Sequence, residues 1–189
     1  MEAIFAKYQG NGSNCWEGTD KGSAHTYVEV YSQLFEPKRD MPVRLLEIGI
    51  CSGASLLAWG EYFTHRDAEI IGIDVAMDAI CYHAGEDKRI RMLQMDGTDT
   101  RTVAALGGTY DIIIDDGSHF PQHQIRSLDL FSPYLRDGGV YVIEDILQIE
   151  HADIIRRYGE QQHGLHGEVF DRRHIKGSAT DVMIVFRKN

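Results

Sequence analysis

The chain has 189 residues, and its 19 lysines and arginines against 29 aspartates and glutamates give a formal net charge of -10 at pH 7. This length accommodates one complete hydrophobic core, so we expect a single domain over residues 1–189. The acidic balance argues against a nucleic-acid partner, which would need clustered lysines and arginines. No apolar stretch reaches the roughly 20 residues that cross a bilayer, which argues against a membrane partner.

The cysteines Cys15, Cys51 and Cys81 are odd in number and lack the spacing of a metal site. This usage is typical of a reducing compartment rather than of a disulfide framework. The N-terminal residues also lack the apolar region of a signal peptide. We therefore expect free thiols and a cytoplasmic protein.

The first 23 residues are polar and rich in glycine, which predicts a mobile arm, residues 1–23, that orders on ligand binding. A helix is expected from about Ala24 to Phe35, ending before Pro37.

Apolar runs then alternate with segments of helical period. The expected strands are 43–49, 69–74, 89–95, 110–115 and 139–144, and the helices between them are 54–65, 77–83, 98–106 and 122–135. A helix over 149–158 follows, and segments 168–175 and 180–187 read as an antiparallel hairpin. The pattern predicts an α/β fold: a Rossmann-like, doubly wound, mostly parallel seven-stranded sheet with a C-terminal antiparallel hairpin.

A turn rich in glycine follows the first strand, where Glu47 precedes Gly49 and Gly53 opens a helix. Glycines at this turn allow a ligand to approach the backbone, and the helix N-terminus offers unpaired N–H groups. The spacing differs from the G-x-G-x-x-G of dinucleotide sites, which argues against NAD.

Acidic residues end the next two strands. Asp74 stands where a carboxylate can accept from both hydroxyls of a ribose, and Asp96 could accept from an exocyclic amine. With Glu47 they suit a positively charged nucleoside, which favours S-adenosylmethionine. The alternative is that the glycines only shape a turn and the acids cap helices. The cofactor candidates are Glu47, Gly49, Gly53, Ser55, Asp74, Asp96 and Asp115. This arrangement resembles the class I S-adenosylmethionine-dependent methyltransferases, except that Cys51 replaces the middle glycine of their first motif.

Two carboxylate pairs, Asp115-Asp116 and Glu144-Asp145, follow the fourth and fifth strands. In a doubly wound sheet these strands are neighbours, and ligands gather beyond their carboxyl ends. Repulsion among four carboxylates requires a divalent cation or strongly shifted pKa values. Hard oxygen ligands favour Mg²⁺, or the similar Mn²⁺, over zinc.

The whole chain resembles the Mg²⁺-dependent sugar O-methyltransferases of macrolide and related natural-product pathways. The resemblance rests on residues 19–22 with His25, Tyr27 and Tyr31, on residues 46–49, on the Asp-Asp-Gly-Ser-His segment 115–119, and on residues 141–145. It implies that Asp116, Glu144 and Asp145 bind the metal and that His119 is the general base. Some members carry an additional N-terminal domain that this sequence lacks, which leaves a homo-oligomeric assembly and the acceptor open.

The chemistry is consistent with these residue types. An alcohol has a pKa far above 7, so a metal would have to acidify it while neutral His119 takes its proton. His123, one helical turn later, is a second candidate base. The alternative is that an aspartate of this loop caps the next helix and His119 is solvated.

We therefore expect an S-adenosylmethionine- and divalent-metal-dependent O-methyltransferase whose acceptor is a small-molecule hydroxyl, of a sugar or glycosylated natural product. Segment 146–173 and the arm are expected to bind the acceptor, because loops vary most freely. Three alternatives stay open: a catechol or phenol O-methyltransferase, a cephalosporin-type hydroxylase, and a non-catalytic module that senses S-adenosylmethionine.

Overall fold

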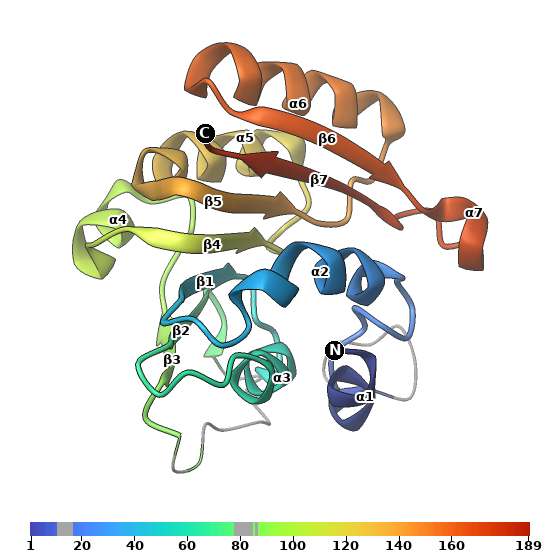
Figure 1. The fold of residues 1–189 in the computed structure, drawn as a ribbon. Coiled ribbons are helices and arrows are strands. Elements are labelled where there is room, and N and C mark those ends of the chain that lie inside the picture. Colours follow the sequence, from blue (N-terminus) through green and yellow to red (C-terminus); the bar gives the residue numbers. More distant parts are fainter. Residues whose placement is uncertain (11–16, 78–84, 86) are drawn as a thin grey trace.

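The computed structural model describes residues 1–10, 17–77, 85 and 87–189. Seven strands form one sheet in the order β3-β2-β1-β4-β5-β7-β6 (Figure 1). They are β1 (Arg44–Ile48), β2 (Glu69–Asp74), β3 (Ile90–Gln94), β4 (Tyr110–Asp115), β5 (Leu135–Ile143), β6 (His166–Asp171) and β7 (Val182–Arg187). The first five are parallel, and β7 runs antiparallel to both of its neighbours. The expected fold class is confirmed.

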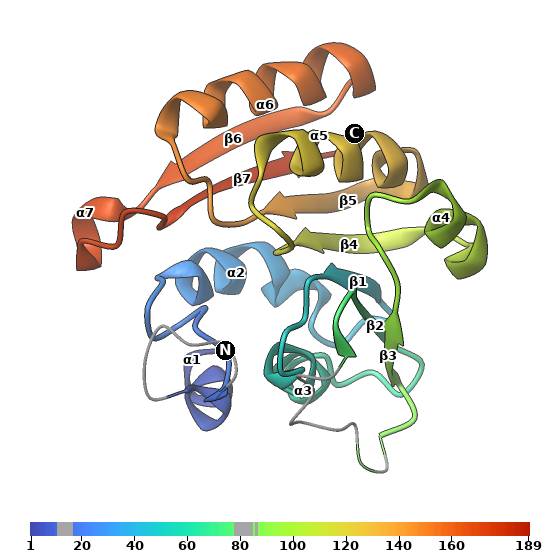
Figure 2. The ribbon, with the colours of Figure 1, turned by 180° about the vertical axis from the view of Figure 1, so that it is seen from behind.

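Helices cover both faces of the sheet (Figures 1 and 2). One face carries α1 (Glu2–Phe5), α2 (Tyr27–Phe35) and α3 (Ala54–Tyr62), and the other carries α4 (Thr100–Leu106), α5 (Pro121–Phe131) and α6 (Ile149–His163). A short helix, α7 (Arg173–Lys176), lies in the connection from β6 to β7, and single 3₁₀ turns are η1 (Ala6–Tyr8), η3 (Glu36–Lys38) and η5 (Ser132–Tyr134). None of the helices in the described ranges is long and apolar enough to span a membrane.

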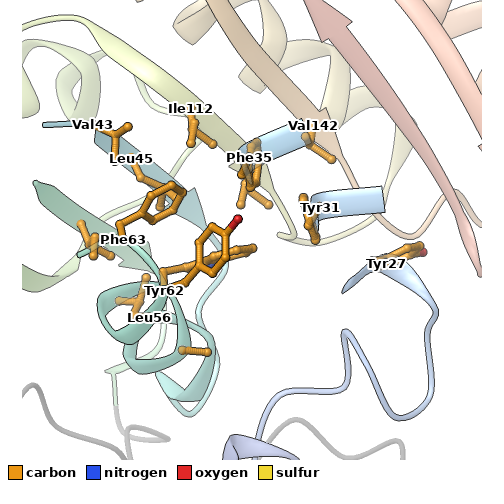
Figure 3. Close-up of a cluster of buried hydrophobic side chains, with 14 of the residues drawn as sticks. Tyr27, Tyr31, Phe35, Val43, Leu45, Leu56, Tyr62, Phe63, Ile112 and Val142 are labelled. Carbon is orange, nitrogen blue, oxygen red and sulfur yellow. The ribbon is translucent and has the colours of Figure 1, made fainter. Parts of the chain in front are cut away.

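The strand sequences explain the two apolar layers. Successive side chains of a strand point to opposite faces, so Ile112 and Ile114 of β4 join one core cluster and Ile113 joins the other. Tyr31 and Phe35 of α2 lie beside the sheet residues of the first cluster (Figure 3). Both faces are buried, which is why the parallel strands read as continuous apolar runs.

Several element boundaries differ from expectation. The antiparallel hairpin is confirmed as the pairing of β6 with β7, but residues 173–176 form α7 instead of extending the strand. Helix α6 continues to His163, and β5 begins at Leu135, inside the expected helix 122–135. Most of the expected helix 77–83 lies outside the described residues.

The N-terminal segment, as far as residues 1–10 and 17–23 are described, packs against the domain rather than extending as an arm. Phe5 is fully buried, with its ring centroid 4.7 Å from that of Trp59. Gln9 pairs with Thr19 in a β-bridge, and Lys21 is buried. The buried side chains of Phe5 and Lys21 therefore hold a segment whose composition is mostly polar. Movement of this segment on ligand binding stays a prediction.

Candidate active site

A cavity of about 710 Å³ lies at the carboxyl ends of β1, β2, β4 and β5. The parallel register brings these ends level, since Ile48 pairs with Ile73 and with Asp115, and Asp115 pairs with Ile143. Residues from Gly18 to His25 and from the connection to β7 complete the wall. The volume is typical of a small-molecule site.

Most of the residues predicted from the sequence meet in this cavity. The wall includes Gly49, Ser55, Asp74, Asp96, Asp115, Asp116, His119 and Asp145. Glu47, Gly53 and Glu144 are absent from the described wall. The structure thus brings the cofactor and metal candidates to one place, with two glutamates set behind it.

The turn after β1 is shaped by packing as well as by its place in the cavity. Gly49 has φ 83°, and a Cβ there would lie 2.2 Å from the carbonyl oxygen of Asp116. Glycine is therefore required by the loop after β4, and not only by a ligand. Gly53, at φ 85°, directly precedes α3. Cys51 in the same turn is disulfide-bonded, so the expectation of free thiols is wrong for Cys51. An odd number of cysteines still leaves room for one pair.

Asp74 and Asp96 both line the cavity and both bind nearby backbone. Asp74 Oδ2 accepts from the N–H groups of Ile50 at 2.9 Å and Cys51 at 3.0 Å, which fixes the turn after β1. Asp96 Oδ1 accepts from the N–H of Thr98 at 2.8 Å and from its hydroxyl at 2.7 Å. The capping alternative therefore describes part of what these carboxylates do.

Backbone strain marks the cavity. Cys51, His119 and Asp145 are the non-glycine residues of the described chain with positive φ, at 42°, 59° and 53°. They follow β1, β4 and β5, and all three line the cavity. Such conformations cost about 1 kcal/mol or more each and cluster at functional sites.

A buried lysine joins the acidic strand ends. Lys21 Nζ lies 2.6 Å from Asp116 Oδ2, 2.8 and 2.9 Å from the two oxygens of Glu144, and 3.1 Å from Glu47 Oε1. Its side chain is 1% exposed. The Tyr31 hydroxyl also donates to Glu144. The sequence places Lys21 in the expected mobile arm and predicts no contact between Lys21 and the acids.

Glu47 and Glu144 are held by buried side chains. Glu47 Oε2 accepts from the Ser55 hydroxyl at 3.0 Å and the Trp59 indole at 3.1 Å. Burial raises the pKa of both glutamates, and Lys21 opposes that rise. Burial also lowers the pKa of Lys21, but the carboxylates outweigh it and hold that pKa well above its usual value.

Asp116, His119 and Asp145 form the candidate metal group, with ligand atoms within 4.8 Å of one another. His119 Nε2 lies 3.9 Å from Asp145 Oδ2, and Asp145 Oδ1 accepts from the Tyr27 hydroxyl at 2.7 Å. Burial, and then the charge of Asp116, raise the pKa of Asp145. His119 Nδ1 is buried and has no hydrogen-bond partner among the described residues.

Two further residues sit beside this group. Asp115 is 3% exposed, and burial raises its pKa to about 7 despite the N–H of Gly117. His123 Nδ1 lies 2.7 Å from the Ser118 hydroxyl at the cavity wall. The cavity therefore holds carboxylates able to bind a cation and imidazoles able to accept a proton.

Comparisons with known proteins agree with this architecture. The family model described as a methyltransferase domain matches residues 46–146. The chain is 36% identical over 136 residues to the 8-demethyl-8-alpha-L-rhamnosyl tetracenomycin-C 2'-O-methyltransferase of Streptomyces olivaceus, covering 68% of this chain and 35% of that protein. It is 37% identical over 135 residues to the mycinamicin VI 2''-O-methyltransferase of Micromonospora griseorubida, covering 66% and 32%. The chain thus spans about a third of the length of these relatives.

Among solved structures, the MycE methyltransferase from the mycinamycin biosynthetic pathway, in complex with Mg and SAH, superposes with a TM-score of 0.71. The match is 22% identical and covers 100% of this chain and 54% of that one, so it shows the fold. The family model, which matches more than half of the chain, shows that the chain belongs to the methyltransferase-domain family, and the superposition agrees with its fold.

Proposed function

We propose that this chain is the catalytic part of an S-adenosylmethionine- and divalent-metal-dependent O-methyltransferase acting on a sugar hydroxyl of a glycosylated small molecule. The observation that carries the proposal is that one cavity joins the strand ends bearing Gly49 and Asp74 to the group of Asp116, His119 and Asp145. The names of two relatives support the acceptor class, because they describe O-methyltransferases of a rhamnosyl and of an olivosyl compound.

The cofactor half of the cavity would be formed by the turn after β1 with Ser55, and by Asp74 and Asp96. The open oxygen of Asp96 and the remaining lone pairs of Asp74 suit hydroxyl and amine donors of a nucleoside. Asp115 closes this half from the end of β4. S-adenosylmethionine would supply an electrophilic methyl group there.

The metal candidates fit a hard divalent cation through Asp116 and Asp145, whose carboxylates line the cavity close together. The third predicted ligand, Glu144, is bound to Lys21 and Tyr31 in this structure. A bound cation would lower the pKa of the acceptor hydroxyl.

The protein's own residues provide proton transfer and positioning. Neutral His119 would accept the hydroxyl proton, and Asp145 beside it would stabilise the imidazolium that forms. The strained backbone at both residues fixes their separation, which matters because methyl transfer is a single displacement that depends on alignment.

Calorimetry and turnover test the proposal together. S-adenosylhomocysteine should bind the protein, and S-adenosylmethionine should methylate a rhamnosyl or olivosyl glycoside; EDTA should abolish turnover, and Mg²⁺ or Mn²⁺ should restore it. Asp116→Asn should lose most turnover, whereas Asp137→Asn, at an exposed position, should not. Absence of S-adenosylhomocysteine binding, with and without Mg²⁺, would show the proposal to be wrong.

A further inference from the structure

Lys21 occupies a position that a lysine rarely takes. Its ammonium group is almost fully buried and contacts carboxylates from three places: Glu47 on β1, Asp116 after β4 and Glu144 after β5. A buried charge is strongly unfavourable unless it is paired and hydrogen-bonded. Here the ammonium group donates to Asp116 and to both oxygens of Glu144 and forms an ion pair with Glu47, so three carboxylates compensate its charge.

Asp116 is shared between two cation positions. Its Oδ2 atom binds Lys21, and the same side chain belongs to the cavity-facing group with His119 and Asp145. The inner position, among Glu47, Asp116 and Glu144, holds the buried ammonium group of Lys21, and the outer position faces the cavity. The two positions differ in composition: the inner one contains the ammonium group of Lys21, and the outer one is formed by two carboxylates and an imidazole.

On the basis of the proposed metal dependence, we infer that Lys21 is the resident cation of the inner position, which confines a divalent ion to the outer position and orients Asp116 toward it. Lys21 is thus a positioning residue for the metal site. The pairing with Lys21 also accounts for the absence of Glu144 from the cavity wall, although Glu144 directly follows β5.

Removing the ammonium group should open the inner position to a metal ion. Lys21→Met leaves the buried carboxylates of Glu47, Asp116 and Glu144 without their cation, and a divalent ion is the available replacement. We expect wild-type protein to bind a single Mn²⁺ ion and Lys21→Met to bind a second one or to bind the first at least about tenfold more tightly. Electron paramagnetic resonance of free Mn²⁺ during a titration measures both quantities.

Two more variants protect this test against loss of folding. Lys21→Arg keeps the positive charge and should retain the wild-type stoichiometry. Lys21→Met combined with Glu47→Gln removes one carboxylate charge along with the ammonium group, while the glutamine can still accept from Ser55 and Trp59. The double variant should fold more readily and should still show increased Mn²⁺ binding relative to wild type.

Lys176→Met is the matched control. Lys176 Nζ donates to the carbonyl oxygens of Gly22 at 2.9 Å, Ser23 at 2.8 Å and His25 at 3.2 Å, so it anchors the same segment without contacting the acids. Its replacement should leave Mn²⁺ binding unchanged. If Lys176→Met increases Mn²⁺ binding as Lys21→Met does, the effect comes from loosening the segment and the inference is overturned.

The outcomes separate this inference from the proposed function. Identical Mn²⁺ titrations of wild type and folded Lys21→Met would overturn the role of Lys21 and leave the methyltransferase proposal intact. Binding by Lys21→Met alone would support Lys21 as the resident cation, but it would contradict both the metal dependence of the wild-type protein and the confinement of an ion to the outer position. No binding by either protein would overturn both.

Discussion

His119 is held in an orientation that its backbone alone would not favour. It has φ 59° immediately after the Asp-Asp-Gly-Ser segment, and its ring lies beside Asp145 at the cavity wall. Left-handed backbone is uncommon for histidine and costs free energy, so the surrounding fold must maintain it. The conformation of the loop after β4 therefore determines where the imidazole lies.

Replacing His119 with alanine should separate the two acceptor classes left open by the sequence. An alcohol needs its proton removed by a base, so turnover of a sugar substrate should fall by about 10²- to 10⁴-fold. A catechol or phenol is more acidic, and its turnover should fall far less. The measurement is kcat for a glycoside and for a catechol with the same variant at saturating Mg²⁺.

His123→Ala serves as the comparison, because His123 also lines the cavity but its Nδ1 contacts the Ser118 hydroxyl. We expect kcat to change by only a few fold. A larger loss from His123→Ala than from His119→Ala would assign the base to His123.

Single residues also show where sequence reasoning stops. Gly49 was placed correctly at the turn after the first strand, yet the sequence could not show that Asp116, far along the chain, excludes a side chain there. Likewise the acids at the strand ends were predictable from position, whereas their hydrogen-bond partners were not. Local sequence determines that a turn forms; packing determines what the turn touches.

At the level of elements, α1 is a short helix whose fully buried side chain is that of Phe5. Phe5 is fully buried in the cluster that includes Trp59 and Tyr31, and α1 contacts α3 through it. Phe5→Ala should lower the free energy of unfolding by about 3–5 kcal/mol, the usual cost of removing a buried phenylalanine. Urea denaturation followed by tryptophan fluorescence measures this change.

Lys7→Ala is the control for the same segment. Lys7 pairs with Glu61 at the surface, and such exposed pairs contribute about 1 kcal/mol or less. If Phe5→Ala has no larger effect than Lys7→Ala, the N-terminal segment does not contribute to the core, and the expected mobile arm would be the better description.

The strands were predictable because apolar runs bounded by glycine and aspartate are distinctive, and each expected strand of the parallel part is found in the sheet. The ends of elements were harder. The sequence Arg-His-Ile-Lys of residues 173–176 is compatible with either a strand or a turn. Helix α7 forms where Lys176 reaches the carbonyl groups of residues 22, 23 and 25. That contact joins distant parts of the chain and leaves no local signal.

At the scale of the molecule, the charge of -10 restricts partners. Carboxylates line the cavity, and they would repel a phosphate backbone. We expect no binding of single-stranded or duplex RNA in fluorescence anisotropy even at ~50 mM salt, where electrostatic binding is strongest. Measurable affinity that falls steeply with added salt would contradict the small-molecule assignment.

The general position of the site followed from topology, since ligands gather beyond the carboxyl ends of parallel strands. The contribution of Lys21 did not follow, because the residue lies 95 positions from Asp116 and 123 positions from Glu144. A lysine in a polar segment gives no sign that it will be buried. Only the excess of carboxylates indicated that some cation had to be nearby.

The long reach of Lys21 has a consequence for how the chain folds. Its ammonium group has no complete set of partners until β5 has paired with β4. We therefore expect the N-terminal segment to dock only after the last parallel strand has formed. Contacts of this sequence separation form late and slow folding. Burial of Lys21 should therefore mark the pairing of β4 with β5 in the parallel part of the sheet, and protection of this amine from chemical labelling would time that step.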